Sequence, residues 1–181
     1  MRLAIALAAG FALSMPALAR EEEWVWPIPQ ISSDISALPA PVRAKRQALI
    51  DAARTGDIAA LKPIIDAQQF PPNVSFGDPV DALAHLKDVS EDDDGRQVLG
   101  LLLDLFDQPY AFHPDGEGET YYIWPYLAEL DPNALTPEQI VDAYRLLDSE
   151  QIDGLKDFGG WFYWRTFISE SGEWSAFVAG D

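Results

Sequence analysis

Apolar residues recur with helical spacing along much of the chain, and this spacing predicts six or seven helices. The segment 98–106 is apolar on nearly every side and is therefore expected to form the central buried helix. Thr136, followed by Pro137 and by Gln139 three residues on, is typical of a capping box that opens a helix. The predicted helical segments are 42–54, 58–67 with a bend at Pro63, 78–88, 98–106, 137–147 and 151–157.

The C-terminal region has the pattern of a β-hairpin. Two runs rich in aromatic and β-branched residues flank a polar loop that contains Gly172. A three-residue loop over 170–172 sets a register in which Ile168 lies opposite Trp174 and Arg165 lies opposite Phe177. Each face of the hairpin then carries large apolar groups, which predicts that other parts of the chain cover both faces.

A second hairpin is predicted where the segments 109–113 and 119–124 flank a turn rich in glycine and acidic residues. Helices and hairpins that do not alternate as βαβ units are typical of the α+β class. The predicted fold is therefore six or seven helices packed on a small antiparallel sheet made of two hairpins, with the C-terminal hairpin at its centre.

The first 19 residues have the composition of a secretory signal peptide. Arg2 gives a positive start, an apolar run covers 3–13, and Ala17 and Ala19 form an A-x-A cleavage site. The apolar run is too short to cross a bilayer. We therefore expect cleavage after Ala19 and a periplasmic or secreted protein without a membrane span; the alternative is a buried N-terminal helix.

The segment 20–41 is rich in proline and serine and has no sustained period, so it is predicted to be an extended leader. Its tryptophans, Trp24 and Trp26, either contact a partner or pack into a groove of their own domain. The remaining residues, 42–181, have the length of a single domain.

The charge balance is strongly acidic, with 12 lysines and arginines against 30 aspartates and glutamates and a net charge of −18 at pH 7. Such a surface repels nucleic acid and anionic lipid, so neither is expected as a partner. It either attracts cations and basic proteins or serves solubility alone. The chain contains no cysteine, which excludes disulfides, a thiolate nucleophile and a cysteine-ligated zinc site. No cofactor is indicated.

Two candidate sites for chemistry lie at the turn of the second hairpin. His113 is followed by Asp115, and a histidine beside a carboxylate can act as a general base, although the sequence identifies no nucleophile for it. Asp115, Glu117 and Glu119 alternate along a glycine-containing turn and could bind Ca²⁺. The alternative is that these are solvated loop carboxylates.

Aromatic residues are concentrated in two stretches, since 14 of the 21 lie within 110–126 or 158–177. Where they face solvent they could stack on a glycan or a peptide; where they face inward they form the core. The candidate binding residues in these stretches are Trp124, Tyr126, Trp161, Tyr163 and Arg165.

Three short segments, 122–126, 135–139 and 177–181, carry a resemblance to a known group. The chain resembles a family of small secreted proteobacterial proteins with no assigned activity, and this resemblance implies no catalytic residues. In its element order, helices first and an antiparallel sheet last, the chain is also similar to cone-shaped domains of the nuclear transport factor type. That similarity implies a pocket for a small molecule.

Three functions follow from these patterns. The first is non-enzymatic binding of an envelope protein or glycan by an exported domain. The second is small-molecule binding in a cone-like pocket, and the third is hydrolysis by His113 with a carboxylate. The sequence specifies neither the ligand nor the oligomeric state.

Overall fold

The structure is a computed structural model that describes residues 28–77, 80–114 and 118–180. The predicted signal peptide, its cleavage site and the two leader tryptophans lie outside the described residues. So do Asp78 and Pro79, which were expected to start a helix, and Asp115 and Glu117 of the predicted turn.

The described residues form six α-helices, three short 3₁₀-helices and five strands. In chain order they are β1 (Gln30–Ser32), η1 (Ile35–Ala37), α1 (Ala40–Ala53), η2 (Ile58–Leu61), α2 (Lys62–Asp66), α3 (Ala82–Asp88), α4 (Arg96–Phe106), β2 (Tyr110–Phe112), β3 (Tyr121–Trp124), η3 (Tyr126–Glu129), α5 (Pro137–Tyr144), α6 (Ser149–Phe158), β4 (Arg165–Ser169) and β5 (Trp174–Val178). None of these helices is both long enough and apolar enough to cross a membrane.

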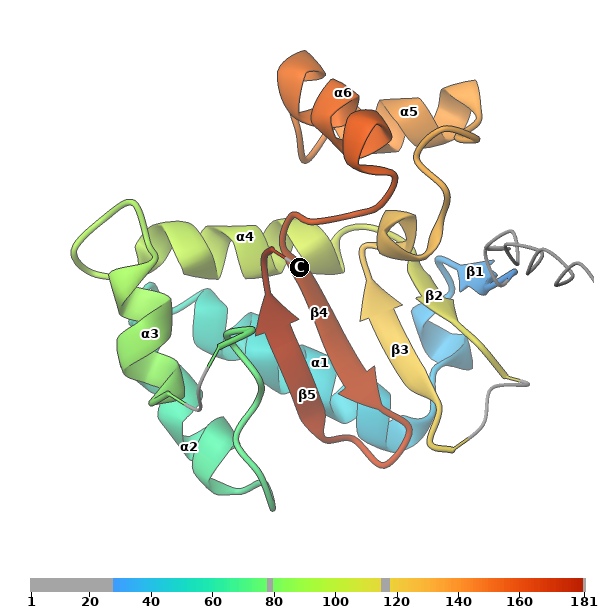
Figure 1. Ribbon diagram of the computed structural model, residues 1–181. Helices are drawn as coiled ribbons and strands as arrows, with labels where there is room; N and C mark the ends of the chain where they lie inside the picture. The colour runs from blue at the N-terminus through green and yellow to red at the C-terminus, as the bar shows by residue number, and fades with distance from the viewer. Residues whose placement is uncertain (1–27, 78–79, 115–117, 181) are drawn as a thin grey trace, which may run out of the picture.

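The five strands form one antiparallel sheet in the order β1-β2-β3-β4-β5 (Figure 1). The α+β class is confirmed, but the expected sheet of two hairpins is too small. The additional strand, β1, comes from the segment expected to be an extended leader. The C-terminal hairpin forms one edge of the sheet, and β3 is central. A strand of three residues gives too few positions for a period of two to be recognised, which is why β1 was missed.

One face of the sheet is covered by helices. Alternate strand residues, among them Trp124, Ile168 and Trp174, point to this side and pack with α1 and α4 in the larger hydrophobic cluster. The predicted central helix is confirmed in α4, where Val98 and Leu102 are fully buried. Figure 1 shows α1 and α4 behind β4 and β5.

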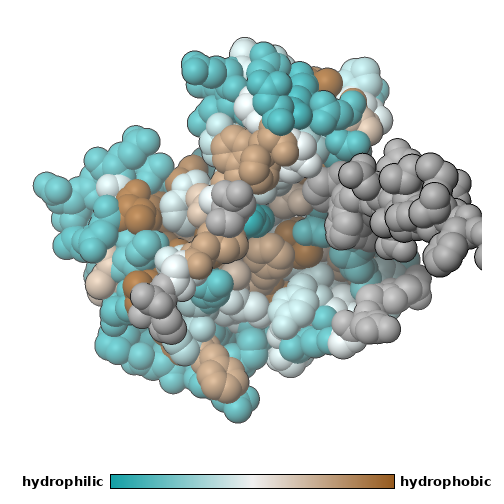
Figure 2. All heavy atoms as spheres, viewed as in Figure 1, coloured by the Kyte–Doolittle hydropathy of each residue, from teal (hydrophilic) through white to brown (hydrophobic). Residues whose placement is uncertain are grey.

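The other face of the sheet is only partly covered. Ala111 and Ile123 pack there in a second cluster with η3, α5 and α6, which sit over one end of the sheet (Figure 1). The outer sides of β4 and β5 lie beyond these helices. Figure 2 shows hydrophobic residues gathered on this face, inside a hydrophilic rim. The expectation that both faces of the C-terminal hairpin are covered is therefore met on one face and only in part on the other.

The register of the C-terminal hairpin changes part way along. Gly172 has a φ of +89° in the expected loop, and Ile168 pairs with Trp174 as predicted. A β-bulge then shifts the pairing by one residue, so that Arg165 pairs with Val178 instead of Phe177. The extra residue lets Trp174 and Phe177, three positions apart, both face the helices.

The outer edge of β5 is partly covered by a loop. Asn73 forms an isolated parallel bridge with Ala176, in which the Asn73 N–H donates to the carbonyl of Ser175 and the Phe177 N–H donates to that of Asn73. The loop also places Phe76 beside the uncovered face.

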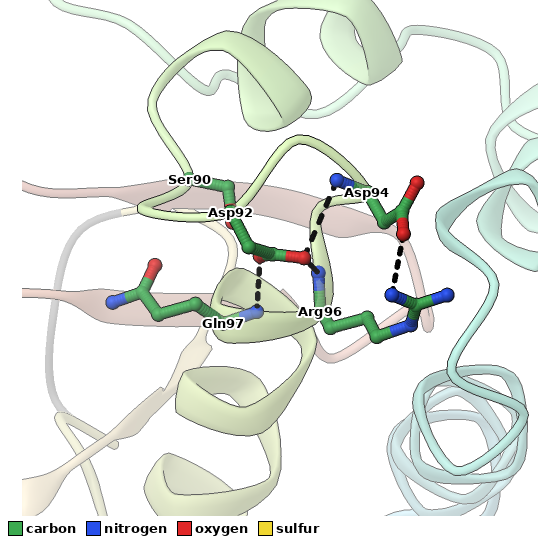
Figure 3. A network of polar contacts seen from close by, with 5 residues as sticks. All are labelled: Ser90, Asp92, Asp94, Arg96 and Gln97. Atoms are coloured by element: carbon green, nitrogen blue, oxygen red, sulfur yellow. Dashed lines mark hydrogen bonds and ion pairs between the residues drawn. The ribbon is translucent and has the colours of Figure 1, made fainter.

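Acidic residues before α4 hold the start of that helix (Figure 3). The Asp92 carboxylate accepts hydrogen bonds from the backbone N–H groups of Gln97, Arg96 and Asp94, and from the Ser90 hydroxyl. Hydrogen bonds from the Gln97 N–H and the Ser90 hydroxyl lower the pKa of Asp92 from 3.8 to about 2. The acidic run therefore has a structural role in starting the central helix.

The other helix signals are confirmed with changed boundaries. Thr136 and Gln139 form the predicted capping box at α5, and Asp148 with Gln151 forms another at α6. Pro63 was expected to bend one helix, but it lies in the first turn of α2, after a separate 3₁₀-helix. Proline is tolerated there because the backbone N–H groups of the first helical turn have no acceptor within the helix. The N–H that proline lacks therefore costs no helical hydrogen bond.

Candidate functional site

The main candidate site is a groove of about 400 Å³ on the uncovered face of the sheet. We call this the sheet groove. Its wall combines outward-facing residues of β3, β4 and β5 with the loop that bridges to β5, and its lining residues are Asn73, Phe76, Tyr121, Arg165, Phe167, Ser175, Ala176 and Val178. Its volume falls in the range of ligand pockets, which are typically apolar with few polar groups.

Strand pairing places the floor of the sheet groove. Phe167 pairs directly with Ala176, so their side chains stand side by side on the uncovered face. Because alanine is small, this pair leaves a hollow next to the Phe167 ring. Two aromatic residues at the rim are open to solvent, with Phe76 50% exposed and Tyr121 41% exposed.

Arg165 lies at one end of the sheet groove and ties three segments together. Its guanidinium donates hydrogen bonds to the carbonyl oxygens of Trp161, Tyr163 and Gly180, at 3.0 to 3.3 Å. The same group lies over the Phe76 ring, 5.3 Å from its centre. Arg165 therefore shapes the groove and fixes the position of a rim aromatic.

The five predicted binding residues are divided by the fold. Trp124, Tyr126 and Trp161 are buried, so their side chains contribute to the core. Tyr163 and Arg165 are half-buried, and of the five only Arg165 lines the sheet groove. The solvent-facing residues of the sheet groove are therefore mostly different from the five predicted binding residues.

All lining residues of the sheet groove except Arg165 were missed from the sequence, namely Asn73, Phe76, Tyr121, Phe167, Ser175, Ala176 and Val178. Phe167 lies two residues from Arg165 in β4, and alternation along a strand places both on the same face of the sheet. The position of Phe76 depends on the bridge between the loop and β5, which leaves no periodic signal in the sequence.

The predicted calcium residues are only partly described, since Asp115 and Glu117 lie outside the described residues. The Glu119 carboxylate accepts a hydrogen bond from the Ser171 N–H, 3.3 Å away. Hydrogen bonds from the Ser171 and Ser169 side chains lower the pKa of Glu119. Within the described ranges, no group of three or more acidic or histidine side chains is arranged to hold a metal ion.

The candidate base His113 has a carboxylate partner in the structure. Its Nε2 lies 2.8 Å from Glu129 Oε2, and both side chains are about one quarter exposed. This contact links the end of β2 to η3 and can orient the imidazole. His113 does not line the sheet groove. A hydrolase would also need a nucleophile and an oxyanion donor around this pair.

Comparison with known proteins adds no family. Neither a scan against protein-family models, nor a search of curated proteins, nor a search of solved structures found a significant match.

Proposed function

We propose that the protein is a non-enzymatic binding domain of the cell envelope that accepts an apolar segment of another protein in the sheet groove. The observation that carries this proposal is an apolar hollow on an uncovered sheet face, with two exposed aromatic residues at its rim. Aromatic anchors around a hollow are typical of the centre of protein interfaces.

The chemistry of the groove favours an apolar polypeptide segment as its ligand. The lining side chains offer aromatic and aliphatic surface at Phe167 and Val178, with polar groups at Asn73, Ser175 and Arg165. An inserted apolar side chain would be removed from water against the aromatic and aliphatic surface. The backbone beside it could form hydrogen bonds with the polar groups. Burial of one large apolar side chain contributes about 1.5–3 kcal/mol.

An extracytoplasmic location is part of the proposal and rests on the signal-peptide pattern of the first 19 residues. Expression of the full chain in a bacterial host should yield a periplasmic protein whose N-terminus, determined by mass spectrometry, is Arg20. Recovery of the uncleaved chain from the cytoplasm would contradict this part of the proposal.

The groove can be tested with matched aromatic variants. A peptide library displayed against the mature chain should yield binders rich in aromatic or aliphatic residues. Tyr121→Ala and Phe76→Ala should each weaken the selected peptides about tenfold or more, the equivalent of about 1.4 kcal/mol. Isothermal titration measures the affinities.

The control variants are Tyr144→Ala and Phe158→Ala. Both residues are 54% exposed, similar to the groove residues they match, and neither lines the sheet groove. These variants should bind the peptides like the wild type. Equal losses in the groove and control variants, or a library without any binder of micromolar affinity, would count against the proposal.

A further inference from the structure

A second hollow, separate from the sheet groove, lies between α4 and the pair α5–α6. We call this the helix cleft; its volume is about 190 Å³. One wall comes from successive turns of α4, at Gln97, Leu101 and Leu105, and the opposite wall includes Gln151 of α6. The segment that leads into β4 closes the cleft with aromatic rings.

The lining combines aromatic rings with amide and carboxylate hydrogen-bonding groups. Tyr163 and Trp164 are half-buried and both line the cleft, so each ring presents part of its surface there. Two amides, from Gln97 and Gln151, and the carboxylate of Glu91 supply the polar groups. No lysine, arginine or histidine lines this cleft. An anionic ligand would therefore find no opposite charge.

One polar group in the cleft lacks a partner within the protein. Gln97 Oε1 is buried and accepts no hydrogen bond, which is costly for an amide carbonyl. The Gln97 backbone N–H is used by Asp92, so the side chain is not needed to start the helix. Because this oxygen is buried, the side-chain amide has to turn toward the cleft before Oε1 can accept a hydrogen bond from a ligand hydroxyl.

We infer that the helix cleft is a binding site for one neutral pyranose ring of a glycan. Sugar hydroxyls both donate and accept, which suits two amides and a carboxylate, while the C–H face of the ring can pack on an aromatic side chain. A cleft of about 190 Å³ suits a single ring and leaves the rest of a longer glycan outside. This site is independent of the sheet groove.

The test uses the mature chain with glucose, N-acetylglucosamine and the linear tetramer of the latter as probes. Isothermal titration and saturation-transfer NMR should detect millimolar binding to the wild type. Gln97→Leu should weaken binding at least tenfold and leave the melting temperature unchanged or higher, because no hydrogen bond within the protein is lost. Gln108→Leu is the control: Gln108 likewise has a buried, unpartnered Oε1 but lies outside the cleft.

A second pair of variants keeps the test decisive should Gln97→Leu fail to fold. Tyr163→Leu removes a ring of the cleft and should weaken binding, whereas Tyr144→Leu, on α5 outside the cleft, should not. Tyr121→Ala, in the sheet groove, should also bind the sugars normally. Absence of binding by the wild type at saturating millimolar sugar, or unchanged affinity in both Gln97→Leu and Tyr163→Leu, would overturn the inference.

Discussion

The indole Nε1 of Trp174 donates a buried hydrogen bond to Thr166 Oγ1, 2.9 Å away across the C-terminal hairpin. The Thr166 hydroxyl in turn donates to the carbonyl of Ala176, also at 2.9 Å. Both side chains are fully buried, so this chain of bonds satisfies polar groups that water cannot reach. It lies at the bulge, where the backbone pairing shifts by one residue.

Replacing Thr166 with valine should destabilise the protein by about 1–3 kcal/mol, because the Trp174 N–H and the Ala176 carbonyl lose a partner while the shape is retained. Urea unfolding followed by circular dichroism measures the difference. Thr166→Ser keeps the hydroxyl and should restore the wild-type position of the Trp174 indole N–H signal in NMR spectra. A valine variant as stable as the wild type would show that the bond contributes nothing.

Gly172→Ala should destabilise the protein more than Gly56→Ala. Both glycines have positive φ, +89° and +70°, so each alanine incurs a cost of about 1–2 kcal/mol. Only at position 172 would the added Cβ also meet a neighbour, 2.8 Å from Pro41 Cβ, whereas position 56 is open. Urea unfolding should therefore give a further loss of about 1–3 kcal/mol for Gly172→Ala. Equal losses would indicate that the segment around Pro41 moves freely.

Asp92→Asn should lower the melting temperature in a pH-dependent way. Its pKa is lowered in the folded protein from 3.8 to about 2, so the ionised carboxylate stabilises the fold above pH 4. That stabilisation is lost as the pH falls from about 4 to about 2, because the carboxyl group then becomes protonated in the folded as well as the unfolded protein. The difference in melting temperature between variant and wild type should accordingly be largest above pH 4 and shrink toward pH 2.

Asp93→Asn is the control for this measurement. Asp93 is exposed and its carboxylate makes no hydrogen bond to any described residue. Its melting curve should follow that of the wild type across the same pH range. A pH-independent difference for Asp92→Asn would show that hydrogen-bond geometry, and not charge, holds the start of α4.

Arg165→Lys should reduce the free energy of unfolding by about 1–2 kcal/mol, since an ammonium group cannot reproduce the planar fork that reaches three carbonyl oxygens. Arg54→Lys, at an exposed position, should be neutral. Urea unfolding of both variants measures the contrast. Equal stability of the two would mean that Arg165 is replaceable as a tie between these segments.

The features predicted correctly from the sequence are those in which local residues determine local geometry. The capping box of Thr136 and Gln139, the left-handed Gly172 and the buried helix α4 each depend on a few neighbouring residues. The bulge in β5 and the strand β1 depend on partners distant in sequence. Their positions follow from packing against α1, α4 and β2, which no local pattern records.

The same limit applies to the candidate site. The sequence located the aromatic-rich stretches, but which rings are buried is decided by how α5 and α6 sit over the sheet. Trp161 was a candidate binding residue and is 8% exposed, while Tyr121, which was not a candidate, is 41% exposed and reaches the rim of the sheet groove. Arg165 was one of the candidate binding residues, and it lines the sheet groove.

The bridge between Asn73 and Ala176 restricts the way in which another protein can approach this sheet. It occupies backbone groups on the outer side of β5, and at the opposite margin β1 offers only three residues. Strand addition, in which a partner extends the sheet through main-chain hydrogen bonds, therefore has little room at either end. A partner that binds in the sheet groove as proposed would therefore approach from above the plane of the sheet, through side chains, and its sequence preference should be set by the size of the residue that enters the hollow beside Ala176.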